Sequence, residues 1–294
     1  MPDILIHPTS QKQIQSFILH PSHAVLFLGP EGIGKRTLSD FLACQLLELP
    51  SSEALTTYPY ITYITPEKDS ISIEAVRDLQ HFTKLKIPGS KTAAWRLIAI
   101  EHTELLTPEA QNAILKLLEE PPQDTIFLLS ATTEQALLPT IQSRVQHISI
   151  LQPAHQDVQA YFANLGYNTA KIQQAYLLSG GLPGLMTSLL SENEEHPLTK
   201  SVEQARAILR ATTFERLSMV DTLAKDKTDT LCLFFVLQQM ARAALTQSTT
   251  KEQRSAHQAI KQWQHILQET YQAENMLLTS AQPKLTLTNL FLNF

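Results

Sequence analysis

The chain has 294 residues, of which 43% are hydrophobic and 17% are charged, enough apolar material for about two or three compact domains. Its formal net charge of −5 provides no overall positive field to attract nucleic acid, so any contact with DNA would be local or shared with other chains. The sequence has no apolar run long enough to cross a membrane and no signal-peptide pattern, which predicts a cytoplasmic protein without a membrane partner.

Three apolar runs in the first half predict buried strands of a parallel sheet. They lie at residues 23–29, 95–101 and 124–132. Helical spacing of apolar residues follows the first run and separates the other two. Thr107 is the expected N-cap and Pro108 the first residue of the helix before the last run, and Pro121 ends it. Strands that alternate with helices predict an α/β domain over residues 1–150, with helices on both faces of the sheet.

The strand pattern fades after this domain, and the rest of the sequence has helical patterns. Two short helices, the second ending at glycines, are expected within residues 151–195. A polar, proline-bearing segment at 191–199 predicts a domain boundary. Long amphipathic stretches at 230–245 and 259–278 predict an all-helical domain over residues 196–294.

The segment GPEGIGKRTL, residues 29–38, departs at one position from the pattern of a phosphate-binding loop. That pattern is G-x-x-x-x-G-K followed by Ser or Thr, placed between a strand and a helix. Backbone N–H groups and the helix N-terminus bind phosphate oxygens, and the lysine adds positive charge. ATP or ADP is therefore the ligand expected here. The candidate nucleotide-binding residues are Gly29, Gly32, Gly34, Lys35, Arg36 and Thr37.

Two departures from an active ATP site predict that hydrolysis is lost. Arg36 replaces the hydroxyl that ligates Mg²⁺, and a guanidinium has no lone pair to offer a cation. Thr37 is the nearest hydroxyl, but it is rotated by about 100° around the helix. At the end of the second predicted strand, Glu101 and His102 replace the expected acidic pair, so an imidazole takes the place of the carboxylate that would polarise water.

Four segments resemble successive motifs of the AAA+ subunits of the bacterial DNA polymerase III clamp loader, most closely the delta-prime type. They are HAVLFLGPEGIGKRTL, IAIEHTELLTPEAQNAILKLLEEPP, LLSATTEQALLPTIQSRV and LSGGLPGLM. The resemblance implies an AAA+ α/β domain at residues 1–150, a helical lid at 151–195, and a helical collar at 196–294 that holds a ring of subunits. Many members carry a four-cysteine zinc module. This chain has only Cys44 and Cys232, which we expect to be buried packing residues, so no zinc is expected.

The resemblance also implies roles for three residues outside the loop. Arg144, in Ser143-Arg144-Val145, matches the arginine that reaches into the ATP site of a neighbouring subunit. Arginine suits this role because it stays charged and spreads positive charge over phosphoryl oxygens. Thr132 matches a threonine at the end of the sensor strand. Pro183 replaces a second sensing arginine of the active ATPases in the family, as is typical of the delta-prime type.

We therefore expect a non-hydrolysing clamp-loader subunit that donates Arg144 to a motor subunit and itself polymerises nothing. The expected partners are gamma/tau-type and delta-type subunits and, indirectly, the sliding clamp and primer–template DNA. Two alternatives stay open. One is an active gamma/tau-type ATPase that uses Thr37 and Glu101. The other is a stand-alone AAA+ regulator that binds nucleotide without a ring, which the helical C-terminal half disfavours.

Overall fold

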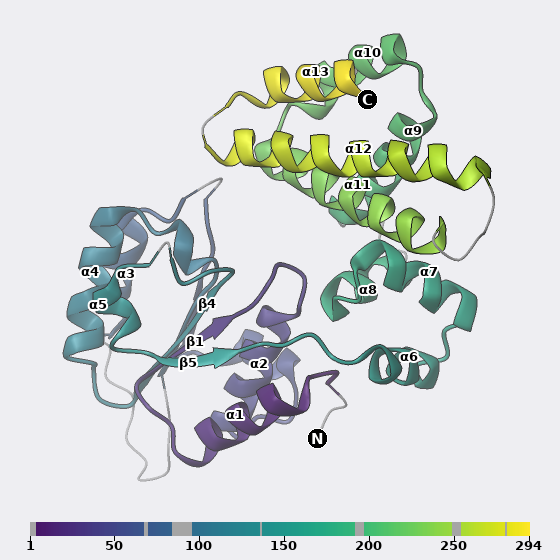
Figure 1. Ribbon diagram of the computed structural model, residues 1–294. Helices are drawn as coiled ribbons and strands as arrows, with labels where there is room; N and C mark the ends of the chain where they lie inside the picture. The colour runs from purple at the N-terminus through teal and green to yellow at the C-terminus, as the bar shows by residue number, and fades with distance from the viewer. Residues whose placement is uncertain are drawn as a thin grey trace. The chain divides into compact units, whose positions relative to one another are not determined.

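The chain forms two compact units, Met1–Ala154 and His155–Phe294. The computed structural model describes residues 4–67, 70–83, 96–135, 137–191, 197–248, 254–279 and 281–294. Within these ranges the first unit combines a sheet with helices, and the second consists of helices (Figure 1). The α/β fold of the first unit and the helical nature of the second confirm the predicted fold class.

The sheet of the first unit has five parallel strands in the order β2-β3-β4-β1-β5. The strands are β1 (Ala24–Leu28), β2 (Ile61–Ile64), β3 (Arg96–Ile100), β4 (Thr125–Ala131) and β5 (Gln146–Ser149). The three inner strands, β1, β3 and β4, confirm the three predicted strands. The sequence pattern does not reveal β2 and β5, because these edge strands are only partly buried and lack a continuous apolar run.

Helices cover both faces of the sheet, as predicted. The helices of this unit are α1 (Pro8–Leu19), α2 (Lys35–Leu46), α3 (Ile73–Thr83), α4 (Pro108–Glu119) and α5 (Pro139–Gln142), with 3₁₀ turns at Ser52–Thr57 and Thr103–Leu105. Strand side chains alternate between the faces, and Leu26, Ile98 and Phe127 share one core with α3 and α4. On the other face α1 contacts β5, and α2 contacts β1 and β4.

The helix α4 begins as the sequence predicts. The Thr107 hydroxyl accepts a hydrogen bond from the backbone N–H of Ala110 at 3.2 Å, and Pro108 is the first helical residue. The side chains of Ile114 and Leu118 are fully buried against the sheet. The helix α4 returns the chain from the carboxyl end of β3 to the amino end of the parallel strand β4.

The second unit contains eight helices in the ranges that the structure describes. They are α6 (His155–Asn164), α7 (Thr169–Ser179), α8 (Pro183–Leu190), α9 (Pro197–Arg210), α10 (Thr213–Leu223), α11 (Lys227–Ser248), α12 (Arg254–Leu278) and α13 (Pro283–Asn293). Gly180 ends α7 with a positive φ of 63°, as the glycine pattern predicts. The helix α7 packs on α11, and α8 on α9, so the expected lid and collar lie within one unit. The predicted boundary at 195–196 touches residues outside the described ranges, and the division into lid and collar stays a prediction.

The two cysteines differ in burial. Cys44 is buried in α2, but Cys232 is only half-buried because it lies at the edge of the buried face of α11, which corrects the expectation for this residue. Burial raises the pKa of the Cys44 thiol, which keeps it protonated. None of the described helices is both long and apolar enough to cross a membrane.

Candidate functional site

The predicted phosphate-binding loop, residues 29–35, connects β1 to α2 at the carboxyl edge of the sheet. Gly29 lies against the chain after β5, since a Cβ at this position would be 3.0 Å from the Ile150 carbonyl oxygen. Gly32 and Gly34 have φ values of 77° and 100°, which glycine adopts without strain. Gly34 is the N-cap of α2, so the loop leads directly into a helix N-terminus. This strand–loop–helix arrangement is the one that phosphate binding requires.

Lys35 is directed into its own loop. Its side chain is only 7% exposed, and its Nζ donates hydrogen bonds to the carbonyl oxygens of Gly29 at 2.8 Å and Pro30 at 3.2 Å. The third contact is to the Glu31 carboxylate at 3.5 Å. An ammonium group has three N–H donors, so these acceptors account for all of them. A phosphate group at this loop must therefore compete with the loop's own oxygens for Lys35.

Arg36 connects α2 to the end of β3. Its Nε donates to the two carboxylate oxygens of Asp40 at 3.0 and 3.1 Å, and its Nη1 pairs with Glu101. The guanidinium carbon lies 4.1 Å from the centre of the Tyr63 ring, a cation–π contact. Burial alone would lower the pKa of Arg36, but the carboxylates of Asp40 and Glu101 outweigh it and raise the pKa. The chain thus places a permanent cation beside Glu101.

The ion pair removes the ligands that Mg²⁺ needs in an ATP site. The carboxylate of Glu101 is already neutralised by Arg36, and Thr37 is exposed one position further along α2. No group of three or more His, Cys, Asp or Glu side chains in the described ranges is arranged to hold a metal ion. With Glu101 paired to Arg36 and no hydroxyl directly after Lys35, the residues at this site do not fit a nucleotide-bound Mg²⁺.

His102, Glu104 and Thr132 form a second set of contacts at the same edge. The Nδ1 of His102 lies 3.8 Å from Glu104 Oε1 and 3.9 Å from Glu31 Oε2. The same Glu104 oxygen accepts hydrogen bonds from the backbone N–H of Thr132 at 3.0 Å and from its hydroxyl at 2.8 Å. The sensor-like threonine is thus bound to a carboxylate of its own chain. Sequence reasoning missed Glu104, because an acidic residue shortly after a strand is too common a pattern to select it.

The pKa values of this pair are shifted in opposite directions. The interaction with Glu104 raises the pKa of His102 above 6.5, against the effect of its burial. Burial would raise the pKa of Glu104, but the nearby imidazole of His102 and the hydrogen bonds from Thr132 outweigh it and lower the pKa. The stabilisation from protonated His102 is therefore fully present below its ordinary pKa and is lost as the pH rises through the raised value.

We predict that Glu104→Gln lowers the pKa of His102, because the neutral amide no longer favours the imidazolium. NMR titration of the imidazole C–H signals measures this pKa. Glu31→Gln is the matched control: its carboxylate is 68% exposed and 3.9 Å from the ring, so we expect a smaller change. An unchanged His102 pKa in Glu104→Gln would contradict the assignment.

Arg144 lies at the opposite end of the sheet, the amino edge, where the amino ends of the parallel strands meet. It precedes β5, whose first residue, Gln146, is aligned with Val25 at the start of β1. The loop lies at the other end, where Gly29 approaches Ile150. At about 3.3 Å per residue, the chain from Arg144 to Ile150 covers roughly 15–20 Å. Arg144 and the phosphate-binding loop are therefore separated by about the length of a strand.

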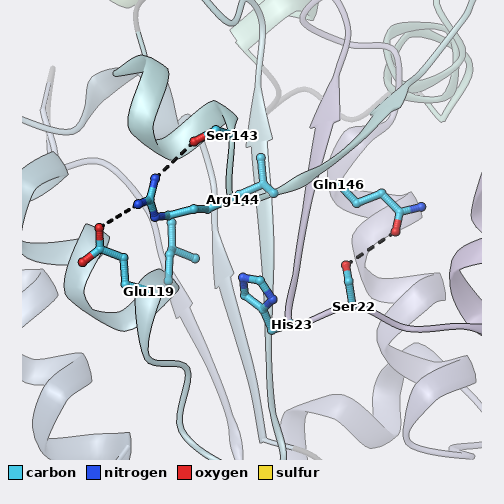
Figure 2. Close-up of a pocket in the computed structure, with 8 residues that line it drawn as sticks. Ser22, His23, Glu119, Ser143, Arg144 and Gln146 are labelled. Carbon is cyan, nitrogen blue, oxygen red and sulfur yellow. Dashed lines mark hydrogen bonds and ion pairs between the residues drawn. The ribbon is translucent and has the colours of Figure 1, made fainter.

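Arg144 lines an open surface pocket of about 710 Å³ (Figure 2). Its lining consists of Ser22, His23, Leu118, Glu119, Ser143, Arg144, Val145 and Gln146. The Nη1 of Arg144 donates to the Thr140 carbonyl oxygen at 2.9 Å and to Ser143 Oγ at 3.1 Å. Its Nη2 pairs with Glu119 Oε1 at 2.9 Å. The remaining predicted residue, Pro183, is the buried first residue of α8 in the second unit.

Together these features define the class of the protein. A five-stranded parallel sheet with a glycine loop and helix after its inner strand β1, followed by a helical unit, is the AAA+ architecture. A solved structure with this fold is that of a DNA polymerase III gamma subunit-related protein from Thermotoga maritima. It has a TM-score of 0.51 and 19% sequence identity, and the match covers 97% of each chain.

Residues 9–154 match the family described as DNA polymerase III, delta subunit. The DNA polymerase III subunit delta' of Pseudomonas aeruginosa is 31% identical over 206 residues, which cover 64% of this chain and 62% of the relative. The subunit delta' of Bacillus subtilis is 32% identical over 181 residues, 54% of each chain. Through this region the chain belongs to the delta-prime-type family of DNA polymerase III subunits. The match spans 62% and 54% of these two relatives, less than two thirds of either.

Proposed function

We propose that the chain is a non-hydrolysing, delta-prime-type subunit of a DNA polymerase III clamp loader that donates Arg144 to the ATP site of a neighbouring motor subunit. The observation that carries this proposal is the position of Arg144 at the amino edge of the sheet, about a strand's length from the chain's own loop. An arginine there does not reach a phosphate in its own loop. It is open to a neighbouring chain, because it lies in a cavity at the surface.

The contacts at the loop support the non-hydrolysing part of the proposal. Lys35 is bound by loop oxygens, and Glu101 is paired with Arg36. An active gamma/tau-type ATPase, the first alternative, needs Glu101 free for a metal, so the ion pair argues against it. We further propose that ATP or ADP, when held at this loop, is bound by the backbone and Lys35 without Mg²⁺.

The proposed partners are gamma/tau-type motor subunits and a delta-type subunit, and the proposed location is the cytoplasm. With them the chain would help to open the sliding clamp and place it on primer–template DNA. ATP binding by the motor subunits opens the clamp in this scheme, and hydrolysis stimulated by DNA releases it. The names of the relatives support this assignment. Gel filtration of the chain with these subunits tests it: co-elution is expected, whereas the stand-alone regulator of the second alternative elutes separately.

The isolated chain is expected to show no ATP hydrolysis above background, because Arg36, His102 and Pro183 all depart from an active site. A phosphate-release assay, with an active gamma/tau-type subunit as the positive control, measures it. Turnover near 1 s⁻¹, about the low end for ordinary enzymes, that disappears in Lys35→Ala would show that the chain is a motor.

A further inference from the structure

Three oxygens hold the guanidinium of Arg144, and they differ in charge. The Thr140 carbonyl and the Ser143 hydroxyl are neutral, and both bind Nη1. Glu119 is the anionic partner and binds Nη2 at 2.9 Å. The neutral oxygens are enough to orient the side chain without cancelling its charge. The carboxylate, in contrast, neutralises the charge that a finger must deliver to a phosphoryl group.

The ion pair between Arg144 and Glu119 is exposed enough for another anion to replace Glu119. The side chain of Arg144 is 33% exposed and that of Glu119 is 49% exposed. Ion pairs in such surroundings are weak because water screens them, and they change an equilibrium constant by about two- to fivefold. A buried pair would hold the arginine far more tightly, since breaking it leaves an unpaired buried charge. The phosphate of a neighbouring chain can therefore displace Glu119 at little cost.

Glu119 is also placed for this exchange. It is the last residue of α4, and Arg144 follows α5, so two different elements supply the pair at the wall of one cavity. Figure 2 shows Glu119 and Ser143 on opposite sides of the guanidinium, each at a different nitrogen, with His23 lying apart from both. Moving Glu119 away leaves both neutral contacts of Arg144 in place.

We propose that Glu119 is a positioning residue that restrains Arg144 in the resting complex and is displaced when the neighbouring ATP site closes on the arginine. This inference rests on the proposed in-trans function of Arg144. The restraint lowers the ATPase rate before primer–template DNA is bound. It has no effect once Arg144 contacts the neighbour's nucleotide.

Glu119→Gln tests the restraint in the reconstituted complex, because glutamine keeps the size and the hydrogen-bonding oxygen but removes the charge. We expect the DNA-independent ATPase rate to rise about two- to fivefold, which is the change in equilibrium constant that an exposed ion pair produces. The rate with primed DNA is expected to stay unchanged, a pattern that a general loss of stability would not produce. Glu120→Gln is the matched control: Glu120 is the next residue, is exposed, and has no ion pair in the described ranges, so neither rate should change.

Arg144→Ala, alone and combined with Glu119→Gln, separates the two proposals. An Arg144→Ala complex with wild-type ATPase activity would overturn the in-trans function itself. If Arg144→Ala lowers the activity but Glu119→Gln behaves like Glu120→Gln, only the restraint is overturned. A lower rate in Glu119→Gln, or a rise that persists when Arg144 is alanine, also overturns the restraint. The expected outcome is a rise in the single variant that is abolished in the double variant.

Discussion

Arg144→Ala is expected to lower the ATPase activity of the reconstituted clamp loader while the complex still assembles. The side chain is partly exposed at a sheet edge, so its removal costs one exposed ion pair and two hydrogen bonds and leaves the core untouched. An arginine finger contributes about 10³–10⁵ in rate at the site that it completes. In a ring with other intact ATP sites the total loss is smaller, because only one site lacks its arginine.

The measurement is DNA-stimulated phosphate release, with gel filtration of the same sample to show that the complex is intact. Arg144→Lys is the informative companion variant. A lysine keeps the charge but lacks the planar fork that binds two phosphoryl oxygens, so we expect no rescue. Unchanged ATPase activity and clamp loading in Arg144→Ala would make this residue an ordinary surface arginine.

The core of the fold follows from the sequence because inner strands and their helices have clear patterns. The strands β1, β3 and β4 are buried on both faces, so each contains a run of at least four consecutive apolar residues. In β5, only Ile148 is fully buried and its neighbours are polar, so the pattern gives no strand. Edge strands depend on hydrogen bonds to a neighbour that lies far away in sequence, which local patterns do not contain.

The residues of the loop could be predicted, but their partners could not. The pattern identifies Arg36 as a departure from an ATP site, yet it does not show that Glu101 pairs with it. That contact joins the start of α2 to the end of β3, 65 positions apart in the chain. Glu104 and Glu119 were missed for the same reason. Their importance comes from the side chains that the fold brings to them, Thr132 and Arg144 respectively.

The position of Arg144 shows what the structure adds to a motif. The sequence resemblance implies that this arginine acts on a neighbouring subunit. The sheet supplies a physical reason, because a chain that leaves β4 at the carboxyl edge must return to the amino edge before a parallel β5 begins. Arg144 lies at the end of that return. Its distance from the chain's own loop is therefore a consequence of the parallel topology.

Removing exposed leucines from α13 is expected to prevent assembly of the clamp loader while the chain still folds. Leu285 and Leu292 are 66% and 60% exposed and lie seven positions apart, so they share one face of α13. If residues 196–294 form the collar that the family resemblance predicts, neighbouring subunits cover this face. Burying two leucines contributes about 3–5 kcal/mol, so the double variant Leu285→Ser, Leu292→Ser should weaken association by at least about a hundredfold.

Gel filtration with the partner subunits measures the loss, and circular dichroism shows whether the variant is folded. Leu19→Ser is the matched control, because Leu19 is 73% exposed on α1 in the first unit and outside the expected collar. A chain that ends after Ala154 lacks the whole second unit and should also fail to join the complex. If the shortened chain co-elutes with the partners, the contacts that hold the ring together lie in the first unit. If only the double leucine variant co-elutes, those contacts lie on another face of the second unit.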